Sequence, residues 1–187
     1  MAVTPSPLAD ALRPSPDASY EAQLAREPMD AIDQARAAAM IGRPLRGESA
    51  VAVRCGWGLP AVLRVAPQLG DGTPFPTMFW LSCPLASKAV GRLEAAGVMQ
   101  DLTRRLRNEP ELSAAYEAAS DRYVRARNQL GERVPRDDSA GGMPMRVKCL
   151  HTLYAHHLAT QDNPIGAWTA GQVEPMPCPA PCVTVEP

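Results

Sequence analysis

The sequence predicts an α+β domain in which a small three-stranded antiparallel sheet packs against four to five helices, with disordered termini. Short runs rich in Val, Phe, Trp and Leu occupy the first half of the chain between turn-forming residues, which is typical of strands. Apolar residues three and four positions apart occupy the second half, which is typical of helices. The 187 residues include 20 prolines, about twice the usual share, and most lie near the ends or between predicted elements.

The first predicted helix spans residues 28–41, because its apolar side chains fall on one face and Gly42 follows its end. Strands are predicted at 49–54, 61–65 and 77–81, which are short and rich in β-forming side chains. A Gly-Asp-Gly turn lies between the second and third strands. We therefore expect one sheet, with the later helices covering a face of it.

Helical patterns dominate after the third strand. Residues 85–106 have apolar side chains at roughly helical spacing, interrupted by Gly97, and a longer helix is predicted at 110–130, where Pro110 suits a first turn. The last helix is predicted to begin at Pro144 or a few residues later. The apolar stripe of the 110–130 helix is interpreted as core or as a groove for a partner, and it consists of Leu112, Tyr116, Ala119, Tyr123, Ala126 and Leu130.

The chain has the length of one domain, which we place at residues 27–166. Residues 1–26 and 167–187 are expected to be flexible tails, because they are rich in proline and lack a repeating apolar face. Within the second tail, Cys178 and Cys182 have a spacing that metal ligands can use. Prolines between them prevent a helix, so a solvated tail is the favoured interpretation.

The charge balance predicts neither nucleic-acid nor membrane binding. The chain has 19 basic and 20 acidic residues, which gives no general attraction to phosphate backbones or anionic lipid. It has no secretory signal pattern and no run of about 18 apolar residues, so no membrane span is predicted. The protein is expected to be cytoplasmic, and its five cysteines are expected to be reduced or to bind metal.

Reactive side chains concentrate in residues 141–157, which contain all three histidines and Cys149. On a helix starting at Pro144, Cys149 and His156 would share a face about 10.5 Å apart, which is too far for one metal ion. A Cys149 and His151 ligand pair instead requires the helix to begin after a loop. Such a pair would suit a zinc site completed by Cys83, with Cys55 or His156 as a fourth ligand.

Cys83 is the second candidate, because it follows an apolar run and precedes Pro84, where a strand ends and a helix begins. A cysteine at a helix N-terminus has a lowered pKa, which favours a nucleophile or a metal ligand. The alternative is a small buried side chain. We hypothesise that Cys83 and Cys149 lie close together, with His151 or His156 beside them, as zinc ligands or as a thiolate with a histidine base.

A weaker candidate is a phosphate-binding turn at Gly141 and Gly142, followed by Arg146 and Lys148. Glycines allow a close approach of backbone N–H groups to a phosphate, but neither the P-loop nor the dinucleotide pattern is complete. A hinge at the entry to a helix is the favoured alternative.

Several blocks of the sequence, in order, resemble a known family. They are Arg54-Cys55 with Gly58-Leu59-Pro60-Ala61-Val62, Asp71-Gly72-Thr73-Pro74-Phe75-Pro76-Thr77, Trp80-Leu81-Ser82-Cys83-Pro84, Arg92-Leu93-Glu94-Ala95-Ala96-Gly97, Gly141-Gly142-Met143-Pro144 with Val147-Lys148-Cys149-Leu150-His151, Ala155-His156 and Asn163-Pro164-Ile165-Gly166. On these blocks, residues 28–166 resemble the bacterial, mainly actinobacterial, domain of unknown function 501 family.

The resemblance implies no established activity. It implies that Cys55, Cys83, Cys149, His151 and His156 occupy positions where the family has similar cysteines and histidines. The chain departs from the family at residues 56–57, where members commonly have proline after the first of these cysteines. The family's genes often lie near those for enolase, a septum-formation protein and an exopolyphosphatase.

Three functional hypotheses follow. The first is a Cys/His site that binds zinc or uses a thiolate. The alternative is a non-catalytic interaction module, linked to cell division or the envelope, that presents a helix stripe to a protein partner. The third is an enzyme acting on phosphate esters or polyphosphate, based on the glycine turn, Arg146, Lys148 and the gene neighbourhood.

Overall fold

A three-stranded antiparallel sheet lies at the centre of the computed structural model, which describes residues 18–131, 140–173 and 176–184. Its strands are β1 (Ser49–Arg54), β2 (Pro60–Val65) and β3 (Phe79–Leu81), in the order β1-β2-β3. Leu63 of β2 is opposite Val51 on one side and Trp80 on the other. The predicted α+β class and the small antiparallel sheet are thus confirmed.

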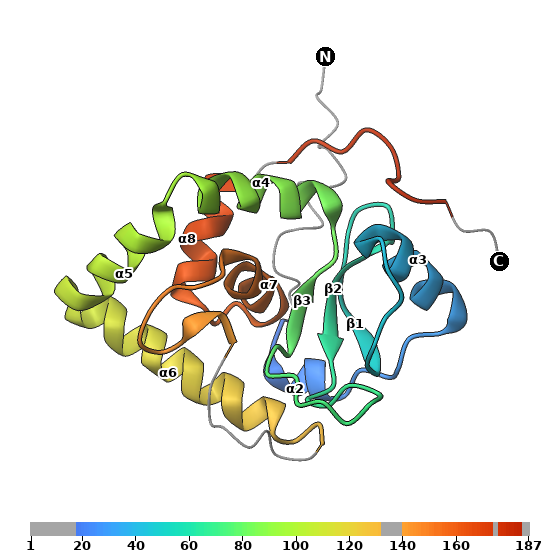
Figure 1. The fold of residues 1–187 in the computed structure, drawn as a ribbon, viewed down its shortest axis with the longest axis horizontal. Coiled ribbons are helices and arrows are strands. Elements are labelled where there is room, and N and C mark those ends of the chain that lie inside the picture. Colours follow the sequence, from blue (N-terminus) through green and yellow to red (C-terminus); the bar gives the residue numbers. More distant parts are fainter. Residues whose placement is uncertain (1–17, 132–139, 174–175, 185–187) are drawn as a thin grey trace.

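Seven α-helices accompany this sheet in the described residues, more than the four to five predicted. The 85–106 pattern becomes two helices, because Gly97 takes a φ of 80° that lets the chain turn between them. Of the further helices, one lies in the predicted N-terminal tail and one extends from the predicted domain into the predicted C-terminal tail. The helices are α2 (Tyr20–Leu24), α3 (Ala31–Ile41), α4 (Pro84–Ala95), α5 (Val98–Asn108), α6 (Pro110–Arg127), α7 (Leu150–Thr160) and α8 (Pro164–Val173). Helices α4 to α8 lie together on one side of the sheet (Figure 1).

Strand β2 separates two hydrophobic clusters, because successive side chains point to opposite faces of a strand. Val62 belongs to the main core together with Phe79 and Leu153 of α7. Leu63 belongs to a second cluster together with Ala37 of α3. Helices α7 and α3 therefore cover opposite faces of the sheet (Figure 1), and every residue of β2 is buried.

The apolar stripe of α6 lies inside the domain. Tyr116, Ala119, Tyr123 and Ala126 are all buried. The Tyr123 hydroxyl also accepts a hydrogen bond of 2.5 Å from the backbone N–H of Met78, just before β3. These four side chains therefore belong to the hydrophobic core and do not form a groove for a partner.

The folded part extends beyond the predicted limits of 27 and 166. In α2, Gln23 is buried and its side-chain amide donates hydrogen bonds to the carbonyls of Ala52 and Ala159. At the other end, α8 continues to Val173, and Met176 after it is 5% exposed. Composition did not reveal these segments, because each is held by contacts with distant residues. Residues 1–17 and 185–187 of the predicted tails lie outside the described residues.

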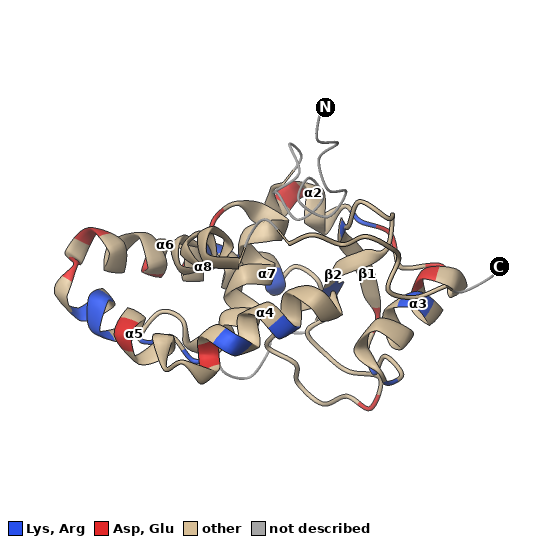
Figure 2. Ribbon diagram, turned by 90° about the horizontal axis from the view of Figure 1, so that it is seen from above, with Lys and Arg blue, Asp and Glu red and all other residues tan. Residues whose placement is uncertain are grey.

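Charged side chains of both signs are interspersed along the helices (Figure 2), in line with the near-equal charge counts. No helix in the described part of the chain is both long enough and apolar enough to cross a lipid bilayer.

Candidate functional site

The start of α7 determines the candidate site, because it decides where the side chains of Cys149 and His151 point. The helix begins at Leu150, and Cys149 is its N-cap residue in an extended conformation. Residues 143–149, between the short 3-10 helix η1 (Ala140–Gly142) and α7, are therefore a loop. A Cys149 and His151 pair requires such a loop before the helix. Residues 149 and 151 are not constrained to opposite faces of one continuous helix.

Gly141 and Gly142 shape this loop, since both have positive φ values of 71° and 93°. A Cβ atom at Gly142 would lie 3.0 Å from the backbone nitrogen of Lys148, so the close approach requires glycine. The Lys148 N–H donates to the Gly141 carbonyl at 2.7 Å, and the Arg146 N–H donates to the Gly142 carbonyl at 3.0 Å. The carbonyls of both glycines and the amides of Arg146 and Lys148 are thus engaged within this segment. Arg146 and Lys148 are exposed.

The structure brings Cys149 and His151 together with Glu94 of α4. One potential ligand atom from each of the three residues lies within 4.8 Å of the others, and each residue is half-buried. The Nδ1 atom of His151 is 3.1 Å from Oε1 of Glu94. The same oxygen accepts a hydrogen bond of 2.6 Å from the backbone N–H of Leu150. Glu94 therefore interacts with the N-terminus of α7, where a negative charge is favourable.

The contact made by the other ring nitrogen of His151 determines which of the two nitrogens carries the proton in the neutral ring. Its Nε2 atom is 3.0 Å from the backbone carbonyl oxygen of Ser87, which can only accept a hydrogen bond. Nε2 therefore carries a proton. In the neutral imidazole, Nδ1 then has the lone pair, and Nδ1 is the atom beside Glu94.

Cys149 and His151 also shift each other's pKa values, and Glu94 contributes to the shift of His151. The interaction with Cys149 raises the pKa of His151 to about 9, and Glu94 acts in the same direction against the effect of burial. Burial raises the pKa of Cys149, but the interactions with His151 and Thr152 outweigh it, so that the pKa lies below its ordinary value. The Thr152 hydroxyl donates to the Cys149 sulfur at 3.6 Å. Without metal, this arrangement favours a thiolate beside an imidazolium.

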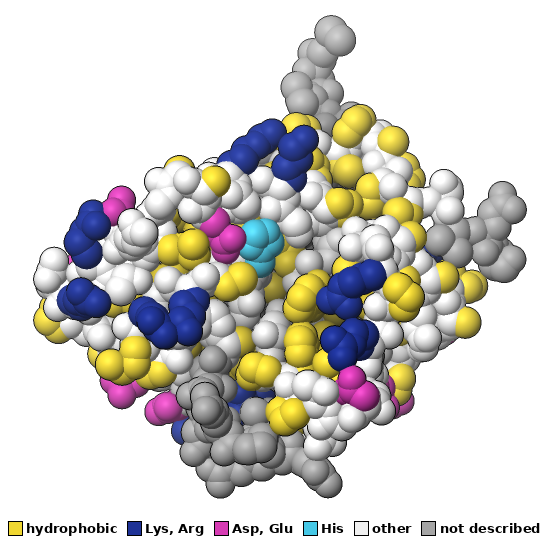
Figure 3. Space-filling view, viewed as in Figure 1, with side chains coloured by type: hydrophobic (Ala, Val, Ile, Leu, Met, Phe, Trp, Pro, Cys, Tyr) yellow, Lys and Arg dark blue, Asp and Glu magenta, His cyan; other side chains and the backbone are white. Residues whose placement is uncertain are grey.

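Cys149 and His151 line a cleft of about 490 Å³. On the face drawn in Figure 3, a histidine lies beside an acidic side chain, next to a hollow bordered by hydrophobic side chains. Ser82, Ser87 and Thr152 contribute polar groups to the cleft. Its remaining lining is hydrophobic and comes from α3, β3 and the start of α4: Met40, Ile41, Phe79, Trp80, Leu81 and Pro84.

Cys83 is the N-cap residue of α4, at the predicted junction, but its environment differs from that expected. Burial raises the pKa of Cys83 to about 11, although the backbone N–H groups of Leu85 and Ala86 act to lower it. The effect of the helix N-terminus is present and desolvation outweighs it. Neither Cys83 nor Cys55 belongs to the ligand group formed by Cys149. Both are buried in the main core.

His156 lies apart from that ligand group as well. Its ring is completely buried and contacts the rings of Tyr20, Phe79 and Tyr123. Its Nε2 atom is 2.5 Å from the Tyr20 hydroxyl and its Nδ1 atom is 3.1 Å from the side-chain nitrogen of Asn163. This histidine is part of the core rather than of the cleft.

Glu94 is the ligand candidate that sequence reasoning did not select. It had no carboxylate partner nearby in the sequence, and 56 positions separate it from Leu150, to which it is hydrogen-bonded. The available signal was its place in the block Arg92-Leu93-Glu94-Ala95-Ala96-Gly97, one of those that resemble the family.

The fold and the site together define an α+β protein with a Glu/Cys/His group at the edge of an apolar cleft. The chain belongs to the family described as Protein of unknown function (DUF501), whose model matches residues 51–171. The matched region contains all three members of this group, as well as the sheet residues from Val51 onward. No curated protein and no solved structure matches the chain.

Proposed function

We propose that Glu94, Cys149 and His151 bind one divalent metal ion, and that zinc is the ion that fits them best. The observation that carries this proposal is the convergence of three ligand types within 4.8 Å, with His151 held by a backbone carbonyl on its other nitrogen. Zinc commonly takes thiolate, imidazole and carboxylate ligands. A metal-bound histidine usually donates its second N–H to a carbonyl or carboxylate, as His151 does to Ser87.

Charge supports the same proposal. A thiolate and a carboxylate supply two negative charges, which a divalent cation neutralises while a neutral His151 offers the lone pair on Nδ1. Three protein ligands leave a fourth tetrahedral position, a pattern typical of catalytic zinc sites. Because Cys149 and His151 line the cleft, a bound molecule there would reach this position. The reaction class that such a site favours is metal-assisted hydrolysis of a substrate with an apolar part.

The test is the zinc content of untagged protein carrying His151→Ala or Glu94→Gln. Each variant removes one of three ligands, so zinc affinity should fall by at least about 100-fold, more than the usual loss of a residue that only orients a ligand. Elemental analysis after dialysis should show about one zinc ion fewer per chain than in the unsubstituted protein. Glu117→Gln, which changes an exposed carboxylate on α6, should retain the full content. Equal zinc content in all four proteins would rule out this site.

A second candidate function is a thiol-dependent reaction with Cys149 as nucleophile, favoured by the lowered pKa of Cys149 beside His151. In metal-free protein, Cys149 should react with iodoacetamide at neutral pH much faster than Cys83, whose pKa is about 11. His151→Gln should raise the pKa of Cys149 and slow its alkylation at pH 7. Peptide mass spectrometry across a pH series measures both rates. Similar rates for the two cysteines, or no effect of His151→Gln, would contradict the nucleophile assignment.

A further inference from the structure

Two buried cysteines lie at one edge of the sheet. Strands β1 and β3 are both antiparallel to β2, so they run in the same direction and end at the same edge. Cys55 directly follows β1, and Cys83 follows β3 by two residues. The backbone N–H of Cys83 donates to Ala61 near the start of β2, the strand between the other two. The topology therefore places both cysteines beside the beginning of β2.

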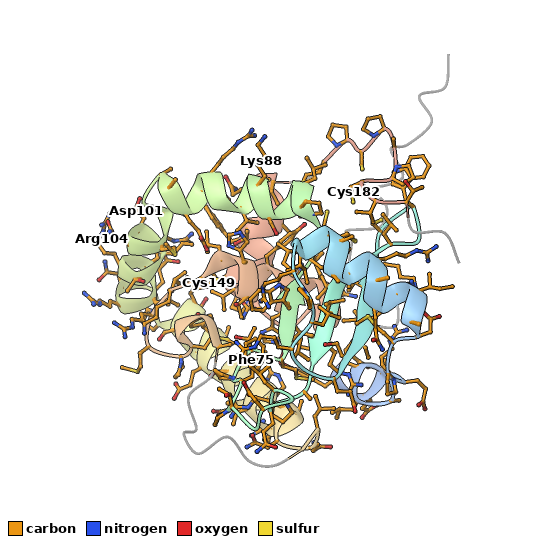
Figure 4. The ribbon with its side chains drawn as sticks, turned by 45° about the vertical axis from the view of Figure 1, so that its right-hand side comes forward. Phe75, Lys88, Asp101, Arg104, Cys149 and Cys182 are labelled. Carbon is orange, nitrogen blue, oxygen red and sulfur yellow. The ribbon has the colours of Figure 1, made fainter. Side chains whose placement is uncertain are left out.

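The chain after α8 returns to this edge and brings two more cysteines. Figures 1 and 4 show the segment 176–184 passing beyond the start of α4, with the labelled Cys182 well away from Cys149. The indole N–H of Trp57, in the turn after Cys55, donates to the backbone carbonyl of Cys178 at 3.1 Å. The side chain of Cys178 also packs against the core cluster that contains Cys55 and Cys83. This proline-rich segment is thus fixed at the cysteine-containing edge.

The four thiols are close enough to interact electrostatically. Cys83 interacts with Cys55 and Cys182, and Cys182 interacts with Cys55 and Cys178. They come from three separate segments of the chain, and only Cys182 is exposed. Cys178 and Cys182 are separated by three residues, which lies within the ligand spacing of structural zinc sites. A tetrahedral zinc site needs four ligands, and Cys55 and Cys83 at the sheet edge supply the two thiols that the C-terminal pair does not provide.

We propose that Cys55, Cys83, Cys178 and Cys182 bind one zinc ion in a closed four-thiolate site that holds the C-terminal segment on the sheet. Binding would release the four thiol protons, because zinc takes cysteine as thiolate. The site differs from the Glu94 group in having no open position, so its role is structural. Among the described residues, no three of these sulfurs all lie within 4.8 Å of one another. Zinc binding would therefore require the segment 176–184 to move inward.

This site explains why a segment rich in proline stays on the domain. Ordering such a segment costs conformational entropy, which its few contacts offset only in part. A zinc ion bound by two residues of the segment and two of the sheet edge would supply the missing free energy. Removal of zinc should therefore release this segment without unfolding the sheet, whose core does not depend on it.

The test uses the full-length protein purified under reducing conditions in the presence of zinc. The unsubstituted protein should contain about two zinc ions per chain, and Cys182→Ser, at an exposed position, should contain about one. His151→Ala should lose the other ion, and the double variant should contain none. Failure of the Glu94 site would leave His151→Ala with the unsubstituted content, so the two proposals fail separately.

Cobalt and proteolysis provide independent measurements. In the His151→Ala background, cobalt(II) should give the strong thiolate-to-metal charge-transfer absorption of a four-cysteine site, and Cys182→Ser should weaken it. Cys149→Ser is the matched control, since it removes a thiol elsewhere and should leave this signal intact. A protease that does not require lysine or arginine should cut the segment 176–184 faster after zinc is removed by a chelator. Unchanged zinc content in Cys182→Ser would overturn the proposal.

Discussion

Replacing Gly166 with alanine is expected to destabilise the domain by about 3 kcal/mol or more, at the upper end of what overpacking costs. A Cβ atom at this position would lie 2.1 Å from the carbonyl oxygen of Leu153 and 2.6 Å from Cβ of His157. Both belong to α7, so backbone atoms must move. Relief of the clash requires α8 to separate from the helix that covers the sheet, and single domains have only about 5–15 kcal/mol of total stability.

Gly171→Ala is the matched control, because it makes the same change in the same helix. An added Cβ at Gly171 meets no described atom within 4 Å. Alanine is favoured over glycine inside a helix, so this variant should be more stable by roughly 0.5–1 kcal/mol. Urea denaturation followed by circular dichroism gives both differences. A similar unfolding midpoint for the two variants would show that α8 does not pack on α7 as closely as the structure indicates.

His156 should make the protein markedly less stable in mild acid. Asn163 accepts a hydrogen bond of 2.8 Å from the Gly166 N–H on its side-chain oxygen, so its NH₂ group points at Nδ1 of His156. Nδ1 must then accept, and Nε2 carries the proton and faces Tyr20. A second proton on the ring would break the bond to Asn163. Burial accordingly lowers the pKa of His156 to about 3.

The sign of the pH dependence follows from this pKa. The unfolded protein takes up a proton on His156 below pH 6.5, whereas the folded protein does not until about pH 3. The unfolded state therefore binds more protons between these values, and the free energy of unfolding falls as the pH is lowered. The expected slope is about 1.4 kcal/mol per pH unit, and the full loss is on the order of 5 kcal/mol. The contribution is complete above pH 6.5.

The measurement compares urea unfolding of the unsubstituted protein and His156→Gln at several pH values from about 7 to about 4.5. The variant should be less stable at pH 7 but should lose less stability on acidification, since its buried amide does not titrate. His157 also has a pKa lowered by burial, and it is present in both proteins. Asp33 has a lowered pKa because of its ion pair with Arg54, and it contributes below this range. Parallel pH profiles for the two proteins would contradict the assignment of the effect to His156.

Much of the fold was predictable because the signals are local. The β-forming side chains of 49–54 and 61–65 indicated strands, and the structure forms them at β1 and β2. Gly97 interrupted the helical pattern, and it separates α4 from α5. The helices α2 and α8 were not predicted, because α2 is short and α8 has little periodicity in a small-residue sequence. Each is stabilised by contacts with α7 that no local pattern records.

The sequence by itself determined most of the secondary structure elements, the family and the residues with reactive side chains. It also indicated that Cys149 and His151 form a pair only if residues 141–148 are a loop and the helix begins later, and the helix begins at Leu150. Only the tertiary structure decided which groups share a site. Glu94 reaches His151 because α4 packs beside the start of α7, whereas Cys83 lies at the sheet edge with the C-terminal segment. Such neighbours depend on how elements pack across long sequence separations, and burial then decides which of them titrate.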